Sequence, residues 1–150
     1  MTITIISKNR KAFHDFEVGE RFEAGIALQG TEVKALRAAK VNLSEGWVDL
    51  GDDGAWLRDT HIGHYSHGNI MNHLETRPRR LLLHKSELLK LEKAVSEKGH
   101  TVVPTQIYFK GPHVKVEVAV AKGKKAHDKR DVKRKKEADR EMERAMKRRQ

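Results

Sequence analysis

Alternating and periodic apolar positions divide most of this chain into short strands with two inserted helices. Residues 22–29 read FEAGIALQ, a strand-like run in which Gly25 predicts a bulge or a sharp bend. Four further strand-like runs form two pairs, because turn residues rich in Gly separate the members of each pair. The sequence therefore predicts two β-hairpins, which join 47–50 to 55–62 and 101–109 to 114–121.

The first predicted helix covers residues 32–39, EVKALRAA, after the Gly30-Thr31 pair. Thr31 is the expected N-cap, and Val33 and Leu36 are spaced to face a core. This spacing is expected to leave three charged side chains nearer the exposed side: Glu32, Lys34 and Arg37.

The second predicted helix follows residues 81–83 and is expected to be capped at Ser86. Lys98-Gly99 supplies its stop signal. Its apolar stripe is expected to consist of Leu88, Leu89, Leu91 and Val95.

Between the first hairpin and the second helix, residues 61–73 are rich in Gly, Asn and His and predict a loop. Residues 76–80 read TRPRR, and Pro78 biases this stretch towards an extended conformation. Several short strands with helical additions indicate a mainly β fold. The expected form is an OB-fold-like closed barrel of residues 1–121, followed by a basic tail of residues 122–150.

Charge separates the expected tail from the expected body. Residues 122–150 carry 14 Lys and Arg against 6 Asp and Glu, a net of +8, whereas residues 1–121 carry 17 against 15. The tail lacks Pro and has almost no large apolar residues to bury, so we expect it to be disordered until a polyanionic partner orders it. Its Arg140, Arg144 and Arg148 would repel one another on one face of a helix, and phosphates along that face would remove the repulsion.

Composition and motifs argue against several other functions. The chain has no Cys, no Walker A pattern and no G-x-S-x-G elbow, so enzymatic activity is not expected. No segment approaches the roughly 18 apolar residues of a membrane span, and we expect a soluble, cytoplasmic protein without a membrane partner. A metal site is not expected either, because Gly63 and Gly68 interrupt the four clustered histidines: His61, His64, His67 and His73.

A nucleic-acid partner is expected from a net charge of +10 and from basic residues gathered in three places. These places are an N-terminal arm at residues 7–11, the cluster of Arg77, Arg79 and Arg80, and the tail. Aromatic residues make up only 5% of the chain, too few for stacking a run of unpaired bases. Recognition of a folded RNA by shape and phosphates is therefore favoured, although each basic cluster has the alternative interpretation of a solvated face.

Three motifs in order resemble the SmpB family, the protein partners of transfer-messenger RNA. They are AGIALQGTEVKALR at residues 24–37, RLLLHK at 80–85, and GKK at 123–125 with DKR at 128–130. The resemblance runs from about Lys8 to Arg130. Departures from the family pattern are Ala35 in place of Ser, Arg79-Arg80 in place of Arg-Lys, and Ala126-His127 in place of Leu-Tyr. An imidazole at His127 can still stack on a base.

The resemblance implies an OB-fold adaptor that binds the tRNA-like domain of transfer-messenger RNA. It also implies delivery to stalled ribosomes, where the tail probes the empty mRNA channel and the decoding centre and becomes helical. The implied RNA-binding residues of the body are Lys8, Asn9, Arg10, Lys11, Gln29, Glu32, Lys34, Arg37, Arg79, Arg80 and Lys85. The implied tail residues are Gly123, Lys124, Lys125, His127, Asp128, Lys129 and Arg130.

A monomer without cofactors or metals is expected from these interpretations. Two alternatives remain at this point. A small structural ribosomal protein would also carry a basic tail on a small barrel, and a metal-dependent enzyme would use the histidine cluster.

Overall fold

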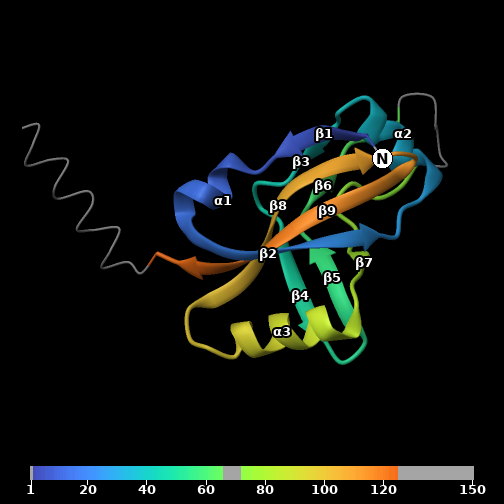
Figure 1. Cartoon of the computed structure of the whole chain (residues 1–150). Coiled ribbons are helices and arrows are strands. Elements are labelled where there is room, and N and C mark those ends of the chain that lie inside the picture. The colour runs from blue at the N-terminus through green and yellow to red at the C-terminus, as the bar shows by residue number, and fades with distance from the viewer. Residues whose placement is uncertain (1, 66–71, 125–150) are drawn as a thin grey trace, which may run out of the picture.

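A seven-stranded antiparallel sheet, strongly twisted, organises the structure (Figure 1). The computed structural model describes residues 2–65 and 72–124. The strand order in the sheet is β1-β8-β9-β2-β7-β5-β4, and a separate pair of two-residue strands joins β3 to β6. The strands are β1 Ile3–Lys8, β2 Phe16–Ile26, β3 Val41–Asn42, β4 Trp47–Gly51, β5 Gly54–Arg58, β6 His61–Ile62, β7 Arg79–Leu82, β8 His100–Lys110 and β9 His113–Gly123.

The long hairpin of β8 and β9 lies near the middle of the sheet and confirms the predicted strand pair. Gly111 takes a φ of 58° at its turn, a value that Gly adopts without steric cost. Val116 and Val118 alternate along β9 and are fully buried. The register shifts after Pro104, where the missing N–H is tolerated because the ladder is already irregular.

The bulge predicted at Gly25 is wrong, because the register of β2 with β9 shifts between Val18 and Arg21. Gly25 pairs regularly with Lys115 on one side and Leu82 on the other. A Cβ at Gly25 would lie 3.3 Å from the Leu82 Cβ. The glycine thus serves close packing between strands and leaves the pairing regular.

The β4–β5 hairpin is confirmed, and its turn places Gly54 at a φ of 115°. The strand predicted for 55–62 does not continue as one strand. It ends at Arg58, since Asp59 adopts a φ of 56° and turns the chain. Ile62 then pairs with Val41 in the smaller sheet.

The helix α2, Gly30–Arg37, begins earlier than predicted. Gln29 is its N-cap in place of Thr31, and it forms a capping box with Glu32. Leu36 is buried as expected, but Glu32 is fully buried and not exposed. This burial corrects the predicted orientation of the helix.

The other two helices are α1, Arg10–Asp15, and α3, Lys85–Val95. Residues 7–11 are thus not a free arm, because they form the end of β1 and the start of α1. The predicted cap at Ser86 is wrong, since the N-cap of α3 is His84. Leu91 anchors α3 in the core as predicted, whereas Leu89 is 56% exposed, so its assignment to the buried stripe is wrong.

The sheet does not close through hydrogen bonds within the described ranges, so a closed barrel is not established. Its two ends in the strand order are β1 and β4. Instead of pairing with β1, β4 lies against β8, and buried apolar residues fill the interior between the strands. The fold is therefore mainly β, with three helices in the described part of the chain.

Regular structure continues slightly past the predicted body boundary at residue 121. The Gly123 N–H donates to the Gly99 carbonyl at 2.9 Å, and the Lys124 N–H donates to the Asp15 carbonyl at 3.3 Å.

Within residues 2–65 and 72–124, no helix has the length and apolarity needed to cross a membrane.

Candidate RNA interface

The Glu32 carboxylate is the centre of a buried ionic network beneath α2. The backbone N–H of Gln29 donates to its Oε1 at 2.8 Å, and the Arg77 guanidinium donates to the same oxygen. Arg79 donates through Nε to Glu32 Oε2. Both carboxylate oxygens are therefore satisfied by cationic or backbone donors, as a buried charge requires.

The remaining donors of Arg79 bind carbonyl oxygens. Its Nη1 reaches the Thr60 carbonyl at 2.7 Å, and its Nη2 reaches the Glu75 carbonyl at 2.9 Å. Because the Arg79 side chain is fully buried, these bonds fix β7 to the segments on either side of β6. One arginine thus connects α2, β7 and both segments.

Burial by itself favours the protonated form of Glu32. The hydrogen bonds from Arg77, the Gln29 amide and Arg79 outweigh this effect and hold the pKa of the carboxyl below its ordinary value. Burial likewise lowers the pKa of the Arg79 guanidinium, and the Glu32 charge opposes that shift. An arginine still keeps its charge at any physiological pH, so the network is ionic in the folded protein.

The outer side of α2 carries the exposed polar groups. Gln29, Lys34 and Arg37 are exposed, whereas Glu32, Ala35 and Leu36 are buried. Residues 34 and 37 are three positions apart in the helix, so Lys34 and Arg37 lie on one helical face. The buried network therefore holds a short helix whose free face is basic.

The segment after β6 is bound to the start of α2. The buried His73 ring donates from Nε2 to the Ile62 carbonyl at 2.8 Å, so its Nδ1 accepts the Thr31 hydroxyl at 2.9 Å. Lys34 Nζ lies 5.0 Å from the centroid of the Tyr65 ring, a cation–π contact. This segment extends the basic face with one aromatic ring.

The predicted histidine cluster is arranged around a carboxylate. His61 Nε2 lies 2.6 Å from Glu75 Oε2, and His64 Nδ1 lies 3.6 Å from Glu75 Oε1. The hydrogen bond from His61 holds the pKa of the Glu75 carboxyl below its ordinary value. No set of three potential metal ligands occurs in the part of the chain that the structure describes, and His67 lies outside it.

The predicted N-terminal residues lie in different environments. Lys8 and Arg10 are exposed, and Lys11 forms an ion pair with Glu45 at 2.5 Å. Asn9 is only 2% exposed, and its amide donates to the carbonyls of Leu43 and Pro104. Its side chain therefore holds α1 in place and presents no surface to a ligand.

Alternation along β7 separates two arginines that the sequence places side by side. Arg79 is buried, whereas Arg80 is exposed on the opposite face, with its guanidinium 5.9 Å from the centroid of the Trp56 ring. Arg80 also donates to the Asp53 carbonyl at 2.8 Å. Lys85 is exposed at the start of α3.

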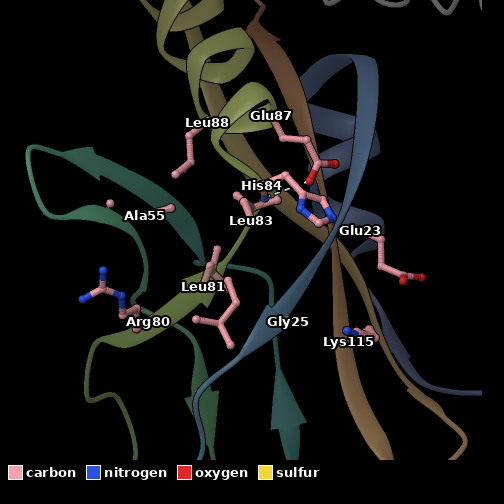
Figure 2. Close-up of a pocket in the computed structure, with 12 residues that line it drawn as sticks. Glu23, Gly25, Ala55, Arg80, Leu81, Leu83, His84, Glu87, Leu88 and Lys115 are labelled. Carbon is pink, nitrogen blue, oxygen red and sulfur yellow. Dashed lines mark hydrogen bonds between the residues drawn. The ribbon is translucent and has the colours of Figure 1, made fainter.

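A groove between β7, α3 and the β2–β9 pair contains Arg80 on one side and Lys115 on the other (Figure 2). Glu23 and Glu87 line the same groove. Because both signs of charge are present, the groove is less suited to phosphates than the free face of α2. The structure thus leaves eight of the eleven predicted body residues exposed, near α1, α2, β7 and α3, and buries the other three: Asn9, Glu32 and Arg79.

Two of the predicted tail residues are described by the structure. Gly123 ends β9, and Lys124 follows it. The other five, Lys125, His127, Asp128, Lys129 and Arg130, lie outside the described residues.

Sequence reasoning missed the roles of two residues at the α2 surface. In the sequence Arg77 belongs to a basic cluster, and only the folded structure shows that it forms an ion pair with Glu32. Tyr65 lies in a segment without periodicity, so no pattern indicated that its ring meets Lys34.

Comparisons with known proteins agree with the motifs in the sequence. A family model described as SmpB protein matches residues 6–148. A relative named SsrA-binding protein from Caldanaerobacter subterraneus subsp. tengcongensis is 49% identical over 148 residues, which cover 99% of this chain and 94% of the relative. Another of the same name from Carboxydothermus hydrogenoformans is 48% identical over 142 residues, 95% of each chain.

A solved structure is also similar, with a TM-score of 0.69 and 45% identity over 80% of this chain and 85% of that chain. It is described as "tmRNA-SmpB: a journey to the center of the bacterial ribosome". The family match continues past Arg130, where the quoted motifs end.

Proposed function

This chain belongs to the SmpB family, and from that premise we propose that it is an RNA-binding adaptor of trans-translation. It binds the tRNA-like domain of transfer-messenger RNA and delivers it to stalled ribosomes. The observation that carries this proposal is the family match over residues 6–148, which includes both the described body and the basic segment after it. The relatives are named for binding SsrA, and the similar structure is described by tmRNA, SmpB and the ribosome.

The free face of α2 is the part of the body best suited to the RNA. Lys34 and Arg37 supply charges for phosphates, and Gln29 supplies a neutral donor and acceptor. Glu32 and Arg79 support this face from beneath through the buried network. Both thus serve RNA binding by positioning α2, although neither side chain reaches the surface.

The tail is proposed to act on the ribosome. Residues 122–150 have a net charge of +8, which suits the RNA walls of the mRNA channel and the decoding centre. Gly123, Lys124, Lys125, His127, Asp128, Lys129 and Arg130 are its proposed decoding-centre residues, and the helix is proposed to form there. RNA binding is thus proposed for the body of residues 1–121, and action on the ribosome for the tail of residues 122–150.

The body is proposed to be an OB-like barrel that closes by packing. Pairing of β1 with β8 and contact of β4 with β8 bring the two ends of the sheet to the same strand. A Cβ at Gly46, just before β4, would lie 2.9 Å from the Pro104 ring of β8. Such close approach supports a closed form in which side chains complete the barrel.

The proposed function requires no chemistry on a substrate. The basic face is proposed to bind RNA through charge and shape, and the buried network supports that face. The proposal includes no cofactor or metal. The protein is proposed to act as a monomer in the cytoplasm, and its partners are transfer-messenger RNA and the ribosome.

Binding of an isolated tRNA-like RNA domain at several salt concentrations tests the role of α2. We expect Lys34→Ala to weaken binding and to reduce the slope of log affinity against log salt by about 1, because one phosphate contact is lost. Lys90→Ala, on the exposed side of α3, is the matched control and should leave both quantities unchanged. Equal effects of the two substitutions would contradict the assignment of the RNA to α2.

A further inference from the structure

The Tyr65 ring is an aromatic surface within the basic face of α2. Lys34 Nζ lies 5.0 Å from its centroid, and the residue as a whole is half-buried. Aromatic residues make up only 5% of the chain. An aromatic ring beside the candidate phosphate-binding lysine therefore indicates a role in binding.

The Asn72 side chain holds the backbone of Tyr65 at two points. The Tyr65 N–H donates to Asn72 Oδ1 at 2.9 Å, and its carbonyl accepts from Asn72 Nδ2 at 2.8 Å. One amide thus satisfies both backbone groups of the tyrosine. This arrangement fixes the point from which the ring projects.

The same segment is bound to α2 and to its C-terminal end. His73 joins Thr31 of α2 to the Ile62 carbonyl, with hydrogen bonds of 2.9 and 2.8 Å. The Gly63 N–H donates to the Lys40 carbonyl, just after α2, at 2.8 Å. These bonds maintain the ring and the helix in one arrangement, so a ligand need not order them.

Aromatic rings bind nucleic acid by stacking on bases, and lysines bind it through phosphates. A folded RNA exposes unpaired bases in its loops and bulges, and such bases stack on aromatic side chains. One ring beside one lysine matches one unpaired base and its neighbouring phosphate. A surface for single strands would need several rings in series.

We propose that Tyr65 stacks on one unpaired base of the bound RNA while Lys34 contacts a phosphate next to that base. This inference rests on the proposed function, because it assumes that α2 binds the RNA. It adds a contact to a base, whereas Lys34 and Arg37 on their own recognise only the negative charge of the phosphates.

Substitutions at Tyr65 separate stacking from hydroxyl chemistry and from charge. Tyr65→Leu should weaken binding of the tRNA-like RNA domain about 5- to 150-fold, with the salt slope unchanged, because a base contact and no ion pair is lost. Tyr65→Phe keeps the ring and should bind like the unsubstituted protein. Circular dichroism and thermal unfolding of each variant establish that the fold is retained.

Fluorine NMR gives a readout that does not depend on affinity. The chain has two tyrosines, so labelling with 3-fluorotyrosine gives two resonances, which Tyr65→Phe assigns. Tyr108 is 5% exposed and donates its hydroxyl to Glu23, so it serves as the internal control. Added RNA should shift the Tyr65 resonance by the ring current of the stacked base and leave the Tyr108 resonance in place.

The outcomes distinguish this inference from the function on which it rests. Failure of the unsubstituted protein to bind the RNA would contradict the proposed function itself. Normal RNA binding with an unmoved Tyr65 resonance, and equal affinity of Tyr65→Leu, would overturn the stacking contact alone. A loss of RNA affinity in Tyr65→Phe as large as that in Tyr65→Leu would also overturn it, since the hydroxyl and not the ring would then make the contact.

Discussion

At the scale of single residues, Glu32 determines how α2 is held. Its side chain is fully buried, and its two oxygens receive donors from Arg77, Arg79 and the Gln29 backbone. Removing one member of such a network leaves the others buried without compensation. The network is therefore the place where a small change should have the largest effect on the body.

Glu32→Gln should lower the free energy of unfolding by roughly 3 kcal/mol, because the two arginines lose their countercharge. Urea denaturation measures this change. Glu92→Gln, at an exposed position of α3, is the matched control and should stay within about 0.5 kcal/mol of the unsubstituted protein. A similar small effect of Glu32→Gln would mean that the ion pairs do not stabilise the fold.

The contribution of Glu32 should also depend on pH. The pKa of its carboxyl is lower in the folded protein than the value of about 4.3 expected for an unfolded chain. Its stabilisation is therefore complete above that unfolded value and is lost as the pH falls through the folded pKa. The difference in unfolding free energy between the unsubstituted protein and Glu32→Gln should be constant above about pH 5.5 and should shrink in stronger acid. A difference that grows on acidification would contradict the assigned direction of the pKa shift.

At the scale of elements, the two hairpins could be predicted because their strands and turns are contiguous in sequence. Gly54 and Gly111 have the positive φ angles that their turns require. The sequence does not show which of Arg79 and Arg80 is buried, because that depends on which face of β7 packs against the core. The capping box of Gln29 and Glu32 was visible as a spacing of three, but Thr31 is the more usual cap residue and misdirected the prediction.

Gly46→Ala tests the contact between β4 and β8. A Cβ there would lie 2.4 Å from Thr60 Oγ1 and 2.9 Å from the Pro104 ring, so we expect a loss of roughly 1–3 kcal/mol in unfolding free energy. Gly30→Ala is the control, since no atom lies within 4 Å of its added Cβ. It should be neutral or stabilising by about 0.5 kcal/mol, because Gly costs stability within a helix. Equal unfolding midpoints for the two variants would contradict close packing at this point of the body.

At the scale of the whole molecule, net charge is distributed unevenly along the chain. The body builds a supported basic helix, and most of the net charge belongs to residues 122–150. The uneven charge and the family could be predicted from the sequence, because composition and motifs are local. The partners of Glu32 could not, since Arg77 and Arg79 lie 45 and 47 positions away along the chain.

The structure also determines where the two parts can be separated. Gly123 and Lys124 still donate backbone hydrogen bonds to the body, so a chain that ends at Lys122 would lose both. A truncated protein should therefore end after Lys124. Such a protein keeps the complete β9 and removes the rest of the basic segment.

The central claim, that the body binds the RNA and the tail acts on the ribosome, is tested most directly with this truncated protein. It should be compared with the full chain for binding of an isolated tRNA-like RNA domain and for tagging on stalled ribosomes. We predict that truncation preserves most RNA binding and abolishes tagging. Loss of RNA binding together with tagging would contradict the division, because the tail would then be a general electrostatic anchor.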